Sequence, residues 1–509
     1  MTDFTAHDGT ATPGNGTTPA ANADALSLPE AIAHWAVLQP DALAIITTTG
    51  RLTYRELSAR VVSLAGSLSA NGVEAGDSVV VTPSGRMDML AAVAAAMSIG
   101  AVPVPMSGVD HEVVAVARDC EAALVVADAG RCGRLADVIR DDSTRPDGWS
   151  GEDGVMVRPD EAPGMLIYTS GTTAGWRRGV MVSRAALTAS VRALSDLFDM
   201  GPATREMVLA PLHHSFGLTR CRAVLHAGGT LVVQEGAFAP ASACMAMETF
   251  GCTVLSAQPS VLATLVQQYG PILASRGRSL RRIVTGTMPL ASAHRERLLD
   301  LMPHVQVTMV YGLSEATHFS ILNMRAEPGR LESVGRPIAG NDVLIAGRDG
   351  TPVPGGWVGH ILIRTPVLAS GYWRRESAWQ ERLRDGWFDT GDIGRLDRDG
   401  YLYVIGRDDD LINVGGEKIA PAEIEDQLAP LLKGAACAVC GVLDPDGIQG
   451  WIPVLFVEGH SAPSAREVAD HLRDRVAEFK IPAVVRAIPL LPRTSSGKVI
   501  RRSLAMLAG

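Results

Sequence analysis

Lysine is scarce in this sequence. Only four lysines, Lys418, Lys433, Lys480 and Lys498, stand among 46 basic residues, and none precedes residue 418. Chemistry that needs a side-chain ammonium therefore has few candidates, all of them near the C-terminus. Acidic residues outnumber basic ones, 55 to 46, which gives a net charge of −9. This balance argues against a nucleic-acid partner, because phosphate backbones are bound by basic surfaces.

Paired cysteines and long apolar runs are also missing. The seven cysteines are scattered and odd in number, which is not the pattern of a disulfide framework. Cys437 and Cys440 lie in a strand-like run without a second ligand pair, so we expect core positions rather than metal ligands. No run reaches the ~18 uncharged apolar residues of a membrane helix. The first basic residue is Arg51, so no secretory signal is expected and a cytoplasmic protein without a membrane partner is predicted.

The length and the pattern along the chain predict more than one domain. A chain of 509 residues exceeds what one hydrophobic core usually supports. Residues 1–25 are rich in Thr, Ala, Gly and Asn and are expected to form a disordered tail. Strand and helix patterns then alternate, which predicts an α/β fold with doubly wound sheets. Short segments separated by turns between residues 333 and 404 predict an added antiparallel, β-barrel-like region.

A charged turn after residue 406 marks the expected domain boundary. Residues 26–406 are assigned to a large N-terminal domain that binds ATP and an acid, and residues 407–509 to a small mobile α+β domain. Apolar spacing predicts helices over residues 219–225 and 464–479, among others.

A glycine- and hydroxyl-rich segment between two apolar runs is the most distinctive stretch. Residues 168–180 read Tyr-Thr-Ser-Gly-Thr-Thr-Ala-Gly-Trp-Arg-Arg-Gly-Val. Glycine lets backbone N–H groups approach an anion, the hydroxyls add donors, and Arg177 or Arg178 supplies positive charge. The pattern predicts a polyphosphate-binding loop between two strands, although a surface turn can have the same composition. It is not a Walker loop, because Gly-Lys-Ser/Thr is absent at the required offset.

Three further motifs carry groups that suit a nucleotide. Tyr311 could stack on a purine, Ser314 could donate to a phosphate, and Glu315 could hold Mg²⁺. Asp392 lies in an Asp-Thr-Gly-Asp turn suited to ribose hydroxyls. Lys498 ends an Arg-Thr-Ser-Ser-Gly-Lys loop. Each motif alone fits an ordinary turn or surface loop, and only the combination in this order is specific.

Together these segments resemble the adenylate-forming superfamily, which includes acyl- and aryl-CoA ligases, luciferases and stand-alone adenylation enzymes. The resemblance covers most of the chain and includes Thr-Gly-Thr-Met-Pro-Leu at 285–290 and Ile-Asn-Val-Gly-Gly-Glu-Lys-Ile at 412–419. It implies a ligase, often of secondary metabolism, that uses ATP and Mg²⁺ to convert a small-molecule acid into an acyl-adenylate. A thiol of CoA or of a carrier protein then captures the acyl group.

The resemblance also implies roles for individual residues. Lys498 would bridge the acid carboxylate and the α-phosphate, Ser314 would meet the α-phosphate, and Glu315 would bind Mg²⁺. His214 would gate thiol entry, and Asp409 would be the hinge of the small domain.

The remaining implied contacts are to the nucleotide. The β- and γ-phosphates would meet the loop residues Thr169, Ser170, Gly171, Thr172, Thr173 and Arg178. The adenine and ribose would meet Gly286, Thr287, Met288, Tyr311, Asp392 and Arg407.

The phosphate loop departs from the family pattern. Where members read Gly-Thr-Thr-Gly-x-Pro-Lys-Gly, this chain reads Gly-Thr-Thr-Ala-Gly-Trp-Arg-Arg-Gly, which is one residue longer and lacks Pro and Lys. Arg178 keeps the positive charge. The departure leaves a slow adenylation step or an altered reaction open.

Position 217 bears on the identity of the acid. In relatives that activate α-amino acids, an Asp at this place pairs with the substrate ammonium, whereas Gly217 stands here. Burying an ammonium without a counter-charge is unfavourable, so an α-amino acid is disfavoured, and glycine is expected to leave room for a flat ring. The expected pocket is lined by His213, Ser215, Phe216, Gly217, Ser256, Gln258 and His318. We therefore expect an aromatic or arylacrylic acid with polar substituents, ahead of a medium aliphatic acid.

Two other functions are compatible with the same motifs. Some relatives activate nitrite and diazotise an aromatic amine, and the irregular phosphate loop leaves that reaction open. A catalytically weak ligand-binding relative is the non-enzyme alternative, and the retained Glu315, Asp392 and Lys498 argue against it.

Overall fold

The computed structural model describes residues 26–107, 110–128, 163–169, 178–288, 290–414, 417–443, 451–494 and 497–508. The expected tail at residues 1–25 lies outside these ranges. Within them, no helix is both long enough and apolar enough to cross a lipid bilayer.

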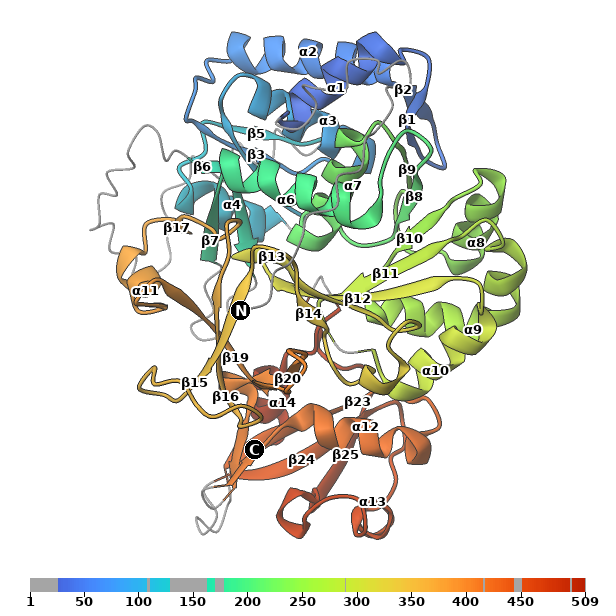
Figure 1. The fold of residues 1–509 in the computed structure, drawn as a ribbon, viewed down its shortest axis with the longest axis vertical. Coiled ribbons are helices and arrows are strands. Elements are labelled where there is room, and N and C mark those ends of the chain that lie inside the picture. Colours follow the sequence, from blue (N-terminus) through green and yellow to red (C-terminus); the bar gives the residue numbers. More distant parts are fainter. Residues whose placement is uncertain are drawn as a thin grey trace, which may run out of the picture.

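A nine-stranded sheet forms the centre of the molecule (Figure 1). Its order is β14-β13-β12-β11-β10-β8-β9-β1-β2; the neighbours from β12 to β1 are parallel, while β13, β14 and β2 are added antiparallel. The strands are β1 (Leu43–Ile46), β2 (Arg51–Thr53), β8 (Arg205–Val208), β9 (Thr230–Val233), β10 (Val254–Ser256), β11 (Arg282–Gly286), β12 (Gln306–Leu313), β13 (Ala316–Asn323) and β14 (Arg336–Pro337). Short strands buried at every residue, such as β9, suit a sheet that is covered on both faces.

Helices cover both faces of this sheet, which confirms the predicted doubly wound arrangement. In β8, Val208 packs into one core and Met207 into the other, because successive strand residues point to opposite faces. The first core is covered by α1 (Leu28–Leu38), α2 (Tyr54–Ala70), α3 (Arg86–Ser98), α6 (Arg184–Phe198) and α7 (Ser215–His226). The second is covered by α8 (Pro240–Thr249), α9 (Pro259–Arg276) and α10 (Ser292–Leu301).

Two three-stranded sheets extend the N-terminal part. One is parallel, in the order β4-β3-β5, and the other is antiparallel, in the order β17-β7-β6. Their elements are β3 (Ser78–Val81), β4 (Val102–Pro105), α4 (Asp110–Asp119), β5 (Leu124–Val126), β6 (Pro163–Thr169), β7 (Arg178–Ser183) and β17 (Gly371–Tyr372). A third core, which includes Val104, Val116 and Leu166, joins them.

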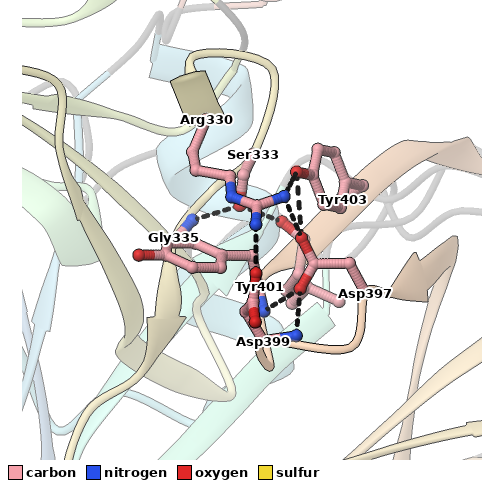
Figure 2. A network of polar contacts seen from close by, with 8 residues as sticks. Arg330, Ser333, Gly335, Asp397, Asp399, Tyr401 and Tyr403 are labelled. Atoms are coloured by element: carbon pink, nitrogen blue, oxygen red, sulfur yellow. Dashed lines mark hydrogen bonds and ion pairs between the residues drawn. The ribbon is translucent and has the colours of Figure 1, made fainter. Parts of the chain in front are cut away.

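The antiparallel region expected between residues 333 and 404 is present as a five-stranded sheet. It consists of β15 (Asp342–Ala346), β16 (Gly359–Arg364), β18 (Leu383–Arg384), β19 (Trp387–Leu396) and β20 (Leu402–Arg407), next to the short helix α11 (Glu376–Gln380). The turn between β19 and β20 is fixed to the segment before β14 by the guanidinium of Arg330, which pairs with Asp397 and Asp399 (Figure 2). This network holds β20, which ends at Arg407, against the central sheet.

The last hundred or so residues form the expected small α+β unit at the bottom of Figure 1. After the 3₁₀ turn η5 (Asp408–Asp410) come β21 (Ile412–Val414), β22 (Glu417–Ile419), α12 (Pro421–Leu432), β23 (Cys437–Leu443), β24 (Trp451–Glu458), α13 (Ala465–Leu472), the 3₁₀ turn η6 (Glu478–Lys480), β25 (Val484–Ile488) and α14 (Arg501–Ala508). Cys437 and Cys440 belong to β23 and pack into different apolar clusters, so the prediction of core positions is confirmed.

Two helices differ from their predicted limits. Helix α7 begins at Ser215 instead of Thr219, and its first turn includes Gly217, whose backbone lies close to the Pro211 carbonyl. Helix α13 ends at Leu472 instead of Phe479. Its apolar residues Val468 and Leu472 are buried, but Phe479 is exposed and provides no packing that would hold further helical turns.

Candidate active site

The predicted phosphate loop connects two paired strands. Tyr168 pairs with Gly179 and Thr169 with Arg178 across the β6–β7 hairpin, so the loop begins and ends on fixed strands. The hydroxyl of Tyr168 donates to Asp119 Oδ2 at 2.5 Å and anchors this hairpin to α4. The loop residues Ser170, Gly171, Thr172 and Thr173 lie outside the described residues.

Glu315 is the predicted Mg²⁺ ligand and lies in the turn between β12 and β13. Tyr372 donates a hydrogen bond from its hydroxyl to Glu315 Oε1 at 2.7 Å. The guanidinium of Arg178 lies 5.5 Å from the centre of the Tyr372 ring. Burial raises the pKa of Tyr372, so the phenol keeps its proton and remains a donor. Tyr372 therefore connects the base of the phosphate loop with Glu315.

The residues present are compatible with Mg²⁺ bound together with a nucleotide. Among the described residues, no three His, Cys, Asp or Glu side chains gather closely enough to hold a metal ion by themselves. Mg²⁺ is commonly bound by one or two carboxylates together with water and substrate phosphates. A single carboxylate beside the phosphate loop, such as Glu315, suits that kind of site.

A second group of polar side chains in the site is centred on Asp392, which contacts Tyr311 and Arg407. The Tyr311 hydroxyl donates to Asp392 Oδ2 at 2.6 Å, and Arg407 Nη1 lies 3.7 Å from Asp392 Oδ1. Asp392 and Arg407 are directly paired between β19 and β20. Burial raises the pKa of Asp392, while Arg407, Tyr311 and Lys498 oppose this effect by stabilising the carboxylate.

Lys498 approaches the same group from the C-terminal unit. Its Nζ lies 3.7 Å from Asp410 Oδ2. Burial lowers the pKa of Lys498, and Asp410 and Asp392 partly restore it. A Cβ atom at the adjacent Gly497 would lie 3.2 Å from Ser260 Oγ, so this loop runs close to the start of α9. The structure therefore brings Lys498, Asp392 and Tyr311 together from distant parts of the sequence.

The segment predicted to meet adenine follows β11. A Cβ atom at Gly286 would lie 2.3 Å from the Val310 carbonyl oxygen, so only glycine fits beside β12. Thr287 has a φ of +74°, which is unfavourable for a β-branched residue. Such strain often marks a functional segment. Thr287 and Met288 are at least partly open to solvent, at the same edge of the sheet as Tyr311.

The expected acid pocket adjoins the N-terminus of α7. His213 and His214 have ring centres 4.2 Å apart, and His214 is the N-cap residue of the helix, directly before Ser215. Phe216 stacks on His318 with ring centres 5.8 Å apart. Gln258 is the buried N-cap residue of α9.

Gly217 was expected to leave room for a flat ring of the substrate, and the structure gives it a different role. A Cβ atom there would lie 2.3 Å from the Pro211 carbonyl oxygen. The glycine is therefore needed for close backbone packing, and its missing side chain points at the main chain rather than into a space for a ring.

Buried polar atoms lie behind Phe216. His318 is 7% exposed and has a φ of +54°, and neither of its ring nitrogens has a hydrogen-bond partner among the described residues. Burial, with a contribution from Arg220, lowers the pKa of His318 to about 3, so the ring is neutral at physiological pH. The hydroxyl of Ser256 is also buried without a partner in the described part of the chain.

Three residues of this region are not among those predicted from the sequence. Arg220 on α7 pairs with Glu206 on β8 through two hydrogen bonds of 2.8 and 2.6 Å, and both side chains are 0% exposed. Tyr372, which holds Glu315, was not singled out either. The available signal for Arg220 was its place, with Arg222, among the apolar residues of a predicted helix, and Tyr372 had no such signal.

Asp409 lies in η5, between β20 and β21, at the predicted boundary of the small domain. Ser314 directly precedes Glu315 in the β12–β13 turn.

The fold and the grouped residues define the class of adenylate-forming enzymes, and comparison with known proteins agrees. Residues 32–373 match the family described as AMP-binding enzyme, and residues 423–498 match the AMP-binding enzyme C-terminal domain. The chain belongs to this family. The predicted class, an ATP-dependent AMP-forming ligase with ATP and Mg²⁺ as cofactors, is thereby confirmed.

Similar proteins extend over nearly the whole chain. A feruloyl-CoA synthase from Amycolatopsis sp is 34% identical over 484 residues, which cover 91% of this chain and 95% of the relative. An indoleacetate–CoA ligase from Aromatoleum aromaticum is 30% identical over 511 residues, with 95% and 98% coverage.

Solved structures that are similar to this chain also extend over nearly its whole length. The o-succinylbenzoate CoA synthetase from Bacillus subtilis, in complex with its acyl-adenylate intermediate, aligns with a TM-score of 0.82 and 27% identity over 93% of this chain and 97% of that one. Another structure of that enzyme, with a TM-score of 0.81, is in complex with ATP and a magnesium ion. Nothing in the comparisons supports the nitrite-activating alternative.

Proposed function

We propose that the protein activates an aromatic or arylacrylic acid with ATP and transfers the acyl group to the thiol of CoA. The observation that carries this proposal is the convergence of Lys498 on Asp392 and Tyr311, beside the phosphate-loop hairpin and Glu315. The reaction is proposed to take place in the cytoplasm, where ATP and CoA are available.

In the first half-reaction, an oxygen of the acid carboxylate forms a bond to the α-phosphorus and the bond to pyrophosphate breaks. The ammonium of Lys498 would stabilise the negative charge that develops around the α-phosphate, and Ser314 would donate a hydrogen bond to it. Glu315 would hold Mg²⁺, which neutralises phosphate charge when bound. Arg178 would add positive charge at the base of the loop, where strand pairing fixes its backbone.

The residues around Asp392 would orient the nucleoside. Tyr311 donates to Oδ2 of this carboxylate, which holds it in one orientation with capacity left to accept hydrogen bonds from ribose hydroxyls. Arg407 lies 3.7 Å from the other oxygen and limits the cost of burying the charge. Gly286, Thr287 and Met288 would provide the surface beside the adenine. Thr169 and the loop residues after it would complete the phosphate contacts.

In the second half-reaction, the thiol attacks the acyl carbon and AMP leaves. The small unit, residues 407–509, would rotate about Asp409 so that Lys498 leaves the site and the thiol can enter. His214, as the N-cap residue of α7 beside the acid pocket, would gate that entry. CoA is proposed as the acceptor because the similar proteins are named as CoA ligases.

The proposed acid carries a hydrogen-bonding substituent on an aromatic ring. Phe216 and His318 offer flat surfaces, and the neutral His318 ring has one donor and one acceptor nitrogen. These nitrogens and the Ser256 hydroxyl are buried without partners in the described structure, which is unfavourable until a ligand satisfies them. Two relatives are named for acids with aromatic rings, feruloyl and indoleacetate.

The test is ATP–pyrophosphate exchange across a panel of acids, followed by thioester formation with CoA. The panel pairs 4-hydroxycinnamate with cinnamate and hydroxybenzoate with benzoate, and it adds nitrite, the proteinogenic amino acids and a long-chain fatty acid. We expect the hydroxylated aromatic acids to exchange fastest. His318→Phe, which keeps the stacking, should reduce the preference for hydroxylated over plain cinnamate roughly tenfold, about the energy of one hydrogen bond. A preference for an amino acid, or exchange driven by nitrite, would contradict the proposal.

A further inference from the structure

A second pocket lies apart from the nucleotide and acid residues, between α1, α3, α6 and α7. About 500 Å³ in and around this pocket is not filled by protein atoms, a volume that includes open solvent at its mouth. Apolar side chains form much of its wall; they include Leu28, Met97, Leu187 and Val191. Arg222 reaches it from α7, about 12 Å along the helix from His214 at a rise of ~1.5 Å per residue. The pocket therefore adjoins the opposite half of α7 from the candidate acid site.

Arg222 is buried in this pocket without a counter-charge from the described part of the chain. The side chain is 4% exposed, its Nη2 donates to the Leu187 carbonyl oxygen, and its Nε has no hydrogen-bond partner among the residues that the structure describes. No ion pair among the described residues includes it. Arg220, two residues earlier on the same helix, is buried equally well but is paired with Glu206 through two hydrogen bonds. Of the two buried arginines of α7, Arg220 has a carboxylate partner and Arg222 has none among the described residues.

A guanidinium without a partner is unfavourable in such surroundings. Burial lowers the pKa of Arg222 to about 10, and no nearby acidic group counters this effect. The group nevertheless stays protonated at neutral pH. Removing a charge from water carries a large penalty unless an opposite charge and hydrogen bonds compensate it, and one backbone carbonyl supplies only part of that compensation. Arg184 and His226 also line the pocket and add donors.

We propose that this pocket is a binding site for a small organic anion, whose acidic head group pairs with Arg222 and whose apolar body contacts α1 and α6. The guanidinium suits a planar carboxylate or a sulfonate, because its N–H groups form a fork that binds two oxygens. The apolar walls favour an anion with a short hydrocarbon portion over inorganic phosphate. The site is separate from the proposed acid-activating site.

The binding test uses 1-butanesulfonate, an anion that cannot be adenylated as a carboxylic acid. Calorimetric titration of the full-length protein should give one site, and Arg222→Met should weaken binding tenfold or more. Lys498→Ala, which alters the other site, should bind as the unchanged protein does. 1-Butanol, which has the same apolar chain without the charge, should not bind measurably. The proposal would be overturned if Arg222→Met bound 1-butanesulfonate as tightly as the unchanged protein, or if Lys498→Ala lost this binding.

Thermal unfolding separates a binding role from a structural one. The Tm of the unchanged protein should rise with 1-butanesulfonate concentration, because a ligand that binds the folded state stabilises it. Arg222→Met should lose that rise while its Tm without the anion is not lowered, since the change removes an uncompensated buried charge. An Arg222→Met protein with a much lower Tm, together with an unchanged protein that ignores the anion, would identify a purely structural arginine.

The sequence next to the pocket carries a negative charge of its own. Asp24 precedes Leu26, a pocket residue, by two positions in the sequence. If Asp24→Asn binds 1-butanesulfonate and the unchanged protein does not, the counter-charge belongs to the chain and the proposal is wrong. Equal binding by both proteins supports the proposal.

Discussion

Replacing Lys498 by alanine tests the centre of the proposed mechanism. We expect ATP–pyrophosphate exchange to fall about 100-fold or more, which corresponds to ~2.7 kcal/mol of lost transition-state stabilisation. The fold should persist, because the ion pair with Asp410 is 3.7 Å long and its side chains are 40% and 30% exposed. Such a pair contributes ~0–1 kcal/mol to stability. Thermal unfolding should therefore change little while exchange is nearly lost.

The scarcity of lysine provides a matched control. Lys480 also lies in the C-terminal unit and also forms an ion pair, with Glu423 at 2.7 Å, but no hydrogen bond or ion pair in the described structure joins it to Asp392. Lys480→Ala should keep exchange within about threefold of the unchanged protein. A threefold change in rate corresponds to ~0.6 kcal/mol, which is the size of effect expected from losing a surface ion pair. Normal exchange in Lys498→Ala, or an equal loss in both variants, would refute the assignment of Lys498.

Three further predictions follow from the same geometry. Asp409→Pro should leave adenylation measurable but block thioester formation, because proline fixes φ at the proposed hinge; equal loss of both half-reactions would contradict the rotation. Glu206→Gln should lower the free energy of unfolding by ~3–5 kcal/mol in urea titrations, because Arg220 would be left as an unpaired buried charge, whereas Glu206→Leu combined with Arg220→Met should recover most of it. Asp392→Asn should weaken ATP binding without lowering Tm at neutral pH. Burial raises the pKa of Asp392 in the folded protein, so its ionised form costs stability above the unfolded pKa, and this cost disappears as the pH falls through the folded pKa. Any gain in Tm from Asp392→Asn should therefore be largest at neutral pH and vanish in acid; the opposite trend would refute the direction of the shift.

The parts of the fold that follow from local patterns could be predicted from the sequence. Runs such as Thr230–Val233 are apolar on both faces and short, which predicts strands of a covered parallel sheet. The phosphate-loop hairpin was predictable because a hydroxyl- and glycine-rich segment lies between two such runs. Motif chemistry also named Tyr311, Asp392 and Lys498, since aromatic, carboxylate and ammonium groups suit different parts of a nucleotide.

Contacts between distant segments could not be predicted in the same way. Tyr372 reaches Glu315 because β17 pairs with β7, where Tyr372 lies opposite Val180, a residue far away in the sequence. The ion pair of Arg220 with Glu206 depends on how α7 lies on the sheet. The start of α7 was misjudged for a related reason: glycine is a poor helix former, but at position 217 close packing on the Pro211 carbonyl outweighs that preference.

The irregular phosphate loop can be reconciled with the rest of the site through its two ends. In the family pattern the lysine directly precedes the last glycine, and Arg178 holds the same place before Gly179; here it is the first residue of β7 and pairs with Thr169 across the hairpin. The guanidinium of Arg178 lies over the Tyr372 ring, and the Tyr372 hydroxyl donates a hydrogen bond to Glu315. The positive charge is thus positioned by a sheet and an aromatic ring, independently of how the longer loop folds. For this reason a loop with an extra residue and without Pro or Lys is compatible with retained adenylation chemistry.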